Sequence, residues 1–288
     1  MKIRKAVIPV AGLGTRFLPY TKAIPKEMLP IMDLPVIHFI VEEAVNSGIN
    51  EILLITSKDK RCIEDYFRPN KKLENFLKLR NKKECLQQLR RVPDNFKLYS
   101  VIQKEPKGLG HAILLSEKFV NGEYFTVFLP DDLIFSKKPV IQQMMDIFTK
   151  YKKPVVAIEQ IDRKKISSYG IIKPKKVCNG IYDILDIIEK PSVEEAFSNL
   201  GIVGRYILPP EIFKYIRKQK TNIKKEIQLT DSLKELINTN GILGYEFEGV
   251  RCDTGDKTEY ILAIFRYASI KKELTKKFKK EIKKIFKI

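Results

Sequence analysis

The feature that most constrains this chain is a short apolar segment that leads directly into a glycine-rich loop. Residues 6–10, Ala-Val-Ile-Pro-Val, have the length and composition of a buried strand. Gly12-Leu-Gly14-Thr-Arg16 follows at once. Because glycine has no side chain, the backbone N–H groups of such a loop can approach an anion or a flat ring closely. The segment therefore predicts a strand that ends in a ligand-binding loop.

Three cations, Arg16, Lys22 and Lys26, follow within a few residues. The loop matches neither common phosphate-binding pattern. No Gly-Lys-Ser/Thr closes it, and Phe17 stands where the dinucleotide fingerprint requires its third glycine, at the start of a helix. Prolines at positions 19, 25 and 30 also exclude a continuous helix here. We expect an extended, proline-stiffened loop that presents its cations to a polyphosphate.

Strand-like and helix-like segments alternate along the first half of the chain. The predicted strands are residues 6–10, 51–56, 98–103, 124–129 and 155–160, and the predicted helices are residues 35–47, 59–67, 110–119 and 140–151. Such alternation predicts a Rossmann-like α/β fold, in which a mostly parallel, mixed central sheet carries helices on both faces. The second half, from residue 169, mixes short strands with isolated helices such as Leu229–Asn238.

The formal net charge of +19 is unusual, and much of it lies in residues 71–91 and 271–288. The second of these segments places Ile270, Leu274, Phe278 and Ile282 at three- and four-residue steps, which predicts a basic amphipathic helix. Such a helix more often packs on its own domain or on a sister subunit than on nucleic acid. Since no nucleic-acid-binding motif accompanies the charge, we expect no nucleic-acid partner.

Membrane, secreted and zinc-binding classes find no support in the sequence. No apolar run approaches the roughly 20 residues that cross a bilayer, and the N-terminal residues lack a signal-peptide pattern. Cys62, Cys85, Cys178 and Cys252 form no Cys-x-x-Cys pair, as is typical of reduced thiols. We expect a cytoplasmic protein without a membrane partner.

The string from Gly12 to Pro30, Gly-Leu-Gly-Thr-Arg-Phe-Leu-Pro-Tyr-Thr-Lys-Ala-Ile-Pro-Lys-Glu-Met-Leu-Pro, resembles the nucleotidyltransferases that make nucleoside-diphosphate sugars. In detail it is similar to the bacterial UTP–glucose-1-phosphate uridylyltransferases. The resemblance implies a glycosyltransferase-A-like nucleotidyltransferase fold, a catalytic domain over residues 1–268 with the amphipathic helix over residues 269–288, and a homo-oligomer, either dimer or tetramer. It also implies the following nucleotide-binding residues in the first loop: Ala11, Gly12, Gly14 and Thr15.

A second glycine loop, Lys107-Gly-Leu-Gly-His-Ala112, follows the strand that ends at Gln103. In the family that it resembles, this region recognises the base. A glutamine amide offers one donor and one acceptor, which complement the O4 and N3–H edge of uracil or thymine. The resemblance therefore implies that Gln103 and Gly108 bind the nucleotide.

Two aspartates resemble the metal-binding pair of the family. Leu-Pro-Asp131-Asp132 follows a hydrophobic strand, and Gly-Val-Arg-Cys-Asp253-Thr-Gly255 lies in a turn-rich segment. Mg²⁺ requires hard oxygen ligands and commonly takes one or two carboxylates together with substrate phosphates. The resemblance implies Asp131 and Asp253 as Mg²⁺ ligands and leaves Asp132 in a supporting role. Glu259 replaces a glycine that is usual in the family, which puts the geometry near Asp253 in question.

Glu189-Lys190-Pro191 resembles the family motif in which the carboxylate binds sugar hydroxyls and the lysine binds the sugar phosphate. Gly170 and Gly204 match positions where backbone approaches the hexose. The string Glu226-Ile-Gln-Leu-Thr-Asp231 resembles a pocket-shaping segment, and we expect a helix there that is capped by Thr230 or Asp231.

The resemblance implies the reaction of UTP with α-D-glucose 1-phosphate, which gives UDP-glucose and pyrophosphate. Arg16, Lys26 and Lys190 would neutralise and align the two anionic substrates. A thymidylyltransferase would keep the same phosphate groups and differ around the 2′-hydroxyl and the pyrimidine methyl. A non-catalytic regulatory paralogue would be expected to carry a damaged glycine loop, whereas Gly-Leu-Gly-Thr-Arg is intact.

Overall fold

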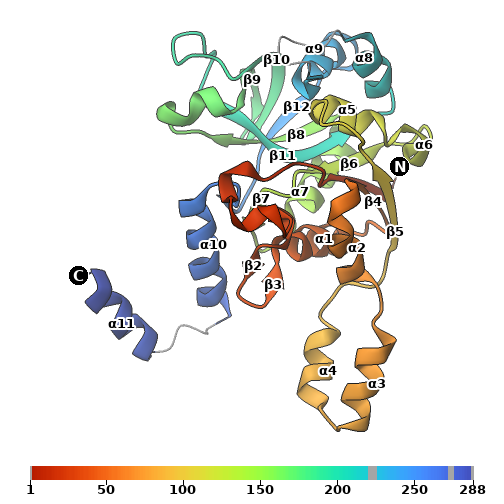
Figure 1. Cartoon of the computed structure of the whole chain (residues 1–288). Helices are drawn as coiled ribbons and strands as arrows, with labels where there is room; N and C mark the ends of the chain where they lie inside the picture. The colour runs from red at the N-terminus through yellow and green to blue at the C-terminus, as the bar shows by residue number, and fades with distance from the viewer. Residues whose placement is uncertain (1, 220–225, 272–275, 287–288) are drawn as a thin grey trace.

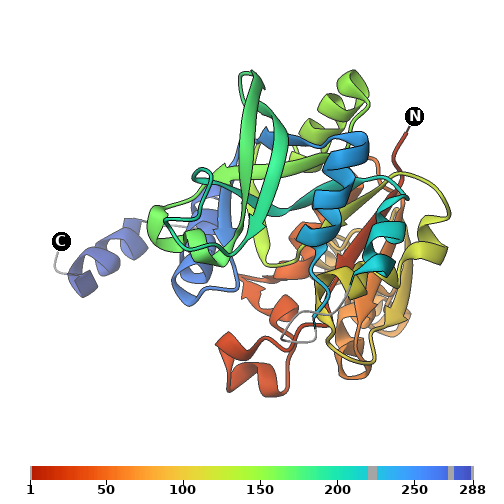
Figure 2. The ribbon, with the colours of Figure 1, turned by 90° about the horizontal axis from the view of Figure 1, so that it is seen from above.

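The computed structural model of the chain describes residues 2–219, 226–271 and 276–286. A nine-stranded mixed sheet forms its centre, in the order β5-β4-β1-β6-β11-β8-β12-β10-β9. The strands are β5 (Lys97–Ile102), β4 (Glu51–Thr56), β1 (Lys5–Pro9), β6 (Phe125–Phe128), β11 (Leu200–Leu208), β8 (Val155–Gln160), β12 (Leu243–Glu246), β10 (Ile181–Glu189) and β9 (Gly170–Cys178). Figure 2 shows the long hairpin of β9 and β10, which ends the sheet.

The all-parallel part of the sheet ends at β6, and beyond it the sheet is mixed, with β12 parallel to β8. β5, β4, β1 and β6 run parallel, in agreement with the α/β alternation of the first half. β11 then runs antiparallel to both β6 and β8, and β10 is antiparallel to β12 and β9. The carboxyl ends of the parallel strands therefore lie at one edge, where the glycine loop leaves β1.

Helices cover both faces of the sheet (Figure 1). Val7 and Leu53 face a cluster with α5 (Gly108–Leu114), α8 (Ile212–Lys218) and α9 (Leu229–Asn240). Their neighbours Ile8 and Leu54 face the opposite cluster, with α1 (Val36–Asn46), α2 (Arg61–Phe67) and α7 (Val140–Tyr151). The alternation follows from the two-residue repeat of a strand, so apolar residues at successive positions bury both faces. The short helix α6 (Glu117–Val120) precedes β6.

A smaller apolar cluster lies beside the main sheet. It joins the hairpin of β2 (Pro30–Ile31) and β3 (Leu34–Pro35) to a two-stranded ribbon of β7 (Asp132–Phe135) and β13 (Val250–Asp253), and to α10 (Lys257–Ile270). In the ribbon, Asp253 pairs in register with Asp132. The ribbon thus brings together two carboxylate segments that lie far apart in the sequence.

The segment that follows β1 differs from the extended loop expected from its prolines. Three single-turn 3-10 helices, Thr15–Phe17, Tyr20–Lys22 and Lys26–Met28, fold it into a compact path. Pro19 and Pro25 stand immediately before two of these turns. Their fixed φ suits the first position of a short helical turn as well as an extended segment, so the prolines start new turns instead of straightening the chain.

The described residues of both lysine-rich segments are mostly helical. Residues 71–91 form the hairpin of α3 (Lys71–Leu79) and α4 (Lys83–Leu89), which projects from the body in Figure 1. Of the range predicted for the tail helix, residues 269–288, the first two residues end α10 and α11 (Lys276–Phe286) lies further along. The Phe278 ring centroid lies 5.8 Å from that of Phe265 in α10. Leu274 lies outside the described residues. Among the described residues, no helix is long and apolar enough to span a bilayer. The division at residue 268 stays a prediction.

Candidate active site

Two neighbouring cavities meet at Asp131. The Lys190 cavity, of about 290 Å³, is lined by residues of β7, β9, β10, β11, α9 and β13. The Gln103 cavity, of about 320 Å³, lies beyond the carboxyl ends of β1, β5 and β6. Leu109, Leu129 and Asp131 line both cavities. Such an arrangement can hold two ligands with their reactive groups on either side of one carboxylate.

Most of the predicted site residues line these two cavities. The Lys190 cavity is lined by Arg16, Asp131, Gly170, Glu189, Lys190, Gly204 and Asp253. The Gln103 cavity is lined by Ala11, Gly12, Lys26, Gln103, Gly108 and Asp131. Gly14 and Thr15 line neither cavity. Gly14 has a φ of 67°, and its carbonyl accepts a hydrogen bond of 2.8 Å from the Thr21 hydroxyl, so it shapes the loop.

A buried lysine that the sequence did not single out holds the first glycine loop in place. Lys60 donates to the carbonyls of Val10 and Gly12, at 2.6 and 2.5 Å, and to Glu27 Oε2 at 2.9 Å. Both Lys60 and Glu27 are buried, and burial raises the pKa of the Glu27 carboxyl. The pair ties the start of the loop to the turn that carries Lys26. No local pattern marks a lysine for such a role, because its partners are backbone carbonyls of a distant segment.

Lys26 lies against the shared carboxylate. Its ammonium donates to Asp131 Oδ1 at 2.5 Å. Burial opposes the charged form, but the charges of Asp131 and Glu27 together raise the pKa of Lys26. The lysine is therefore a fixed positive charge at the junction of the two cavities.

The two predicted metal ligands converge. Thr254 donates to the carbonyl of Asp131 through its N–H at 2.8 Å and its hydroxyl at 2.9 Å, and thereby docks the Asp253 turn on Asp131. A β-carbon on Gly255 would lie 2.9 Å from Asp253 Oδ1 and 3.4 Å from Asp131 Oδ2. Burial, and then the charge of Asp132, raise the pKa of Asp253, while Arg251 opposes the shift.

These carboxylates fit a divalent cation. They offer hard oxygens, and their mutual repulsion is relieved by a positive ion. Among the residues that the structure describes, no three or more His, Cys, Asp or Glu side chains gather into a metal-binding group. Two carboxylates that leave coordination positions for substrate oxygens are the donor set that Mg²⁺ commonly takes.

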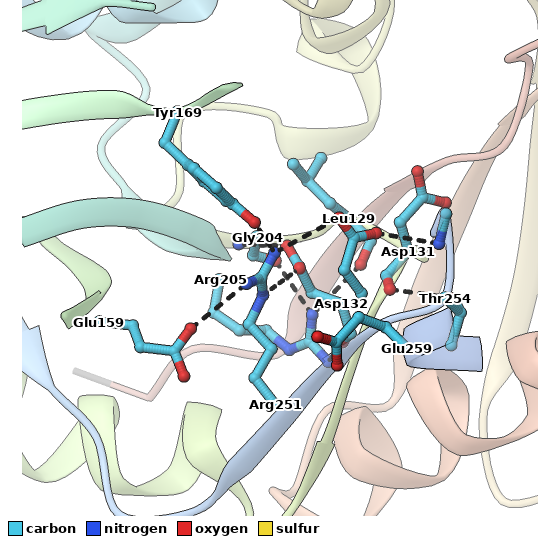
Figure 3. Close-up of polar contacts among 12 residues, drawn as sticks. Leu129, Asp131, Asp132, Glu159, Tyr169, Gly204, Arg205, Arg251, Thr254 and Glu259 are labelled. Atoms are coloured by element: carbon cyan, nitrogen blue, oxygen red, sulfur yellow. Dashed lines mark hydrogen bonds and ion pairs between the residues drawn. The ribbon is translucent and has the colours of Figure 1, made fainter. Parts of the chain in front are cut away.

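A network of charged side chains surrounds Asp132 and supports the turn that carries Asp131 (Figure 3). Asp132 Oδ2 accepts from the Gly204 N–H at 2.7 Å, and Asp132 Oδ1 accepts from Arg251 Nε. Arg251 also donates to Glu159 at 3.2 Å and to the Tyr169 hydroxyl at 3.1 Å. The supporting role expected for Asp132 agrees with these contacts, because both of its oxygens are engaged inside the protein.

Arg205 extends this network to α1. Its side chain is fully buried and pairs with Glu43 at 2.7 Å. It also donates to the carbonyls of Asp132 at 2.9 Å, Gly204 at 3.1 Å and Leu129 at 3.3 Å. These carbonyls belong to the turn that carries Asp131 and to the strand beside it. The signal in the sequence was a single cation in an otherwise uncharged strand, together with a glutamate on the apolar stripe of α1.

The second glycine loop forms the start of α5, and its glycines allow close approach of protein backbone. A β-carbon on Gly108 would lie 2.6 Å from the Ile227 carbonyl oxygen, and one on Gly110 would lie 2.9 Å from the same atom. Two backbone hydrogen bonds join the segments, from Ile227 N–H to the Lys107 carbonyl and from Gly110 N–H to the Ile227 carbonyl. The Glu226–Asp231 string therefore packs on the second glycine loop and also lines the Lys190 cavity.

Glu189 is oriented by α9. The Thr230 hydroxyl donates to Glu189 Oε2 at 2.6 Å, so Thr230 does not cap α9 as expected. The helix begins at Leu229 after an extended Gln228 that makes no side-chain cap. Lys190 has a left-handed φ of 49°, and its backbone N–H donates to the Tyr169 carbonyl at 3.0 Å. Its ammonium lies 3.7 Å from Glu189 Oε1 and remains half-exposed in the cavity wall.

Glu259 makes its polar contacts with residues other than Asp131 and Asp253. Its carboxylate pairs with Lys165 at 3.4 Å, and its N–H is capped by Asp256 Oδ1 at 3.0 Å. Asp256 also accepts from the Thr258 N–H and thereby starts α10. Glu259, which replaces a glycine usual in the family, is thus accommodated in the first turn of α10.

Comparisons with known proteins agree with this geometry. Residues 5–269 match the nucleotidyl transferase family model. A UTP–glucose-1-phosphate uridylyltransferase 1 of Staphylococcus saprophyticus is 43% identical over 288 residues, which are 99% of this chain and 100% of the relative. A UTP–glucose-1-phosphate uridylyltransferase of Bacillus subtilis is 42% identical over 95% of this chain and 94% of its own.

A solved structure of a UDP-glucose pyrophosphorylase in complex with UDP-glucose superposes with a TM-score of 0.85 at 41% identity. The match covers 93% of this chain and 99% of that one. The α/β nucleotidyltransferase fold expected from the sequence is thereby confirmed. The chain belongs to the nucleotidyl transferase family and, within it, to the UTP–glucose-1-phosphate uridylyltransferases.

Proposed function

We propose that the protein transfers a uridylyl group from UTP to α-D-glucose 1-phosphate and releases pyrophosphate. The observation that carries the proposal is the meeting of the Gln103 and Lys190 cavities at Asp131. A nucleotide in the first cavity and a sugar phosphate in the second would place their phosphates at this junction. The activities named for the relatives support the same assignment.

In the reaction, a phosphate oxygen of glucose 1-phosphate attacks the α-phosphorus of UTP in line. The bond from the α-phosphorus to the β-bridging oxygen breaks, and pyrophosphate leaves with the electron pair. No general base is required because the attacking phosphate is already ionised at pH 7. The chain's main tasks are to neutralise charge and to align the two anions.

Each cation has a distinct part in this alignment. Lys190, half-exposed in the cavity wall, holds the attacking phosphate. Lys26 and Arg16 balance the triphosphate, and Arg16 is held by a hydrogen bond of 3.3 Å to the Gly255 carbonyl. Glu189, fixed by Thr230, accepts hydrogen bonds from sugar hydroxyls. Asp131 and Asp253 would hold Mg²⁺, which supplies charge neutralisation for the phosphates when bound.

The test is an assay of pyrophosphate release with UTP, dTTP, CTP, ATP and GTP against several sugar 1-phosphates. We expect the highest kcat/KM with UTP and glucose 1-phosphate, and loss of turnover in EDTA that returns with Mg²⁺. A preference for dTTP would favour the thymidylyltransferase alternative. No turnover with any pair would favour the regulatory paralogue and contradict the proposal.

A sharper test of roles is Lys190→Ala. It should lower kcat by about a hundredfold or more, because a positioned cation on a transferring phosphate is lost. UTP binding, measured by calorimetry, should change little. An equal loss of UTP binding would refute the role of Lys190.

We place the enzyme in the cytoplasm, as a homo-oligomer of two or four chains, with no nucleic-acid or membrane partner. Light scattering coupled to size exclusion measures the assembly. A monomer at micromolar concentration would contradict this part alone.

A further inference from the structure

The Gln103 amide is held by two contacts whose chemistry fixes its orientation. Gln103 directly follows β5, and its backbone N–H donates to the Thr56 carbonyl at 2.8 Å. Its side-chain Nε2 lies 2.9 Å from His111 Nδ1 and 3.5 Å from the Gly108 carbonyl oxygen. A carbonyl oxygen can only accept, so the NH₂ end of the amide faces these two atoms.

This orientation leaves the amide oxygen for the cavity. Within the part of the chain that the structure describes, Gln103 Oε1 has no hydrogen-bond partner. Unlike Glu27 Oε1, this oxygen is not fully enclosed by protein. Gln103 lines the cavity that bears its name. An acceptor without a protein partner, in the wall of a cavity that holds a base, can select among bases, because bases differ in where they carry N–H groups.

His111 can accept only in one tautomer. Since its Nδ1 receives the Gln103 hydrogen bond, its ring proton lies on Nε2. Burial first, and then the charge of Lys107, lower the pKa of His111, and Glu105 opposes them. Two backbone hydrogen bonds of Ile227, to Lys107 and to Gly110, fix the start of α5, the helix that carries His111.

We infer that His111 is a positioning residue for base selection: it holds the Gln103 amide with the oxygen toward the base, and so favours a pyrimidine with a hydrogen on N3. This inference rests on the proposed function, because it assumes a nucleotide base in the Gln103 cavity. Uracil and thymine carry N3–H and donate to this oxygen. Cytosine presents a lone pair at N3, which the oxygen repels.

Without His111, the amide can turn. Its NH₂ end would retain only the long contact to the Gly108 carbonyl. A half-turn about the last side-chain bond would then present a donor to the base and suit cytosine. Discrimination between UTP and CTP therefore depends on His111, whereas discrimination between UTP and dTTP does not.

The experiment compares His111→Phe, which keeps a ring but removes the acceptor, with His111→Asn, whose Oδ1 can replace Nδ1. We expect His111→Phe to lower the UTP:CTP ratio of kcat/KM about tenfold or more, the effect of one hydrogen bond that changes partner. The UTP:dTTP ratio should stay within about threefold, and His111→Asn should restore most of the UTP:CTP ratio. An unchanged UTP:CTP ratio in His111→Phe, or an equal change in both ratios, would overturn the inference.

A second measurement needs no variant that alters packing. The chain has two histidines, so the ring nitrogens of His111 can be assigned in long-range ¹H–¹⁵N spectra of the wild-type protein. We expect the Nε2–H tautomer at pH 7, and the Nδ1–H tautomer would overturn the inference whatever the activity. If the wild type bound UTP without transferring it, the proposed function would be contradicted but the inference about His111 would not. The UTP:CTP and UTP:dTTP ratios of dissociation constants would then test His111.

Discussion

Lys26 donates to Asp131 Oδ1 at 2.5 Å, so one cation serves both the predicted triphosphate site and the predicted metal site. Lys26 lines the Gln103 cavity, and Asp131 is shared with the Lys190 cavity. Before substrates bind, the ammonium compensates a carboxylate that otherwise faces Asp253. When phosphates and a metal ion enter, the same ammonium can turn to the phosphates, so the site need not hold uncompensated charge at any stage.

Lys26→Met should therefore act in opposite directions on metal binding and on turnover. The freed Asp131 should bind Mn²⁺ more tightly in the absence of nucleotide, as measured by EPR titration. The value of kcat/KM for UTP should fall about a hundredfold, because a buried cation that neutralises phosphate is lost. Lys22→Met is the matched control, since Lys22 is exposed and lines neither cavity. Weaker Mn²⁺ binding in Lys26→Met would contradict this account.

Arg205 and Glu43 form a buried pair whose members should be strongly coupled. Arg205→Met leaves the Glu43 charge uncompensated and should cost about 3–5 kcal/mol in the free energy of unfolding. The double variant Arg205→Met/Glu43→Gln should cost less than the sum of the two single variants, because it leaves no orphan charge. Urea unfolding of the four proteins measures the coupling. Additive losses would show that the pair acts through packing alone.

Gly204→Ala should disturb the aspartate turn directly. The added β-carbon would overlap Asp132 Oδ2 and lie 2.5 Å from Leu129 Cβ. Such overpacking costs about 1–3 kcal/mol, and the displaced turn should lower kcat by about tenfold or more. Gly122→Ala is the control: its φ is 75° but its β-carbon meets nothing within 4 Å. The control should lose stability and keep kcat; a similar fall in kcat would argue against a local effect at Gly204.

Asp253→Asn should stabilise the fold while it removes activity. Burial and the neighbouring Asp132 charge raise the pKa of Asp253, so at pH 7 its ionised form costs folding free energy. The folded state holds the Asp253 proton more tightly than the unfolded chain does. Proton binding therefore contributes to the free energy of unfolding at low pH, and this contribution is lost as pH rises through the folded pKa. We expect Tm in EDTA to rise by about 2 °C at pH 8 and less at pH 4. A lower Tm at pH 8 would contradict this sign.

The sequence could predict those parts of the molecule that depend on local pattern. The strands at residues 51–56 and 155–160 have the predicted limits, because continuous apolar runs of this length bury both faces. Most of the motif residues that carry the resemblance line the two cavities, although Gly14 and Thr15 line neither, and their roles stay predictions. These motifs are local strings, so they can be read without knowledge of the partners that the fold supplies.

The remaining features depend on contacts between distant segments. Lys60 holds the glycine loop through backbone carbonyls 50 and 48 residues away, and no composition or spacing marks it. The sequence predicts Thr230 as a helix cap, but its hydroxyl donates to the Glu189 carboxylate. The extended residue Gln228 precedes the helix instead. In both cases a tertiary partner outweighed a local preference.

The ribbon of β7 and β13 has a consequence for the order in which the molecule becomes competent. A chain emerging from the ribosome exposes Lys26, Gln103 and Asp131 early, but the hydrogen bonds from Thr254 to Asp131 span 123 residues. Until residues beyond 255 have emerged, Asp132 lacks Arg251 and the second carboxylate is absent. We therefore expect nascent or prematurely terminated chains that lack Asp253 to be inactive.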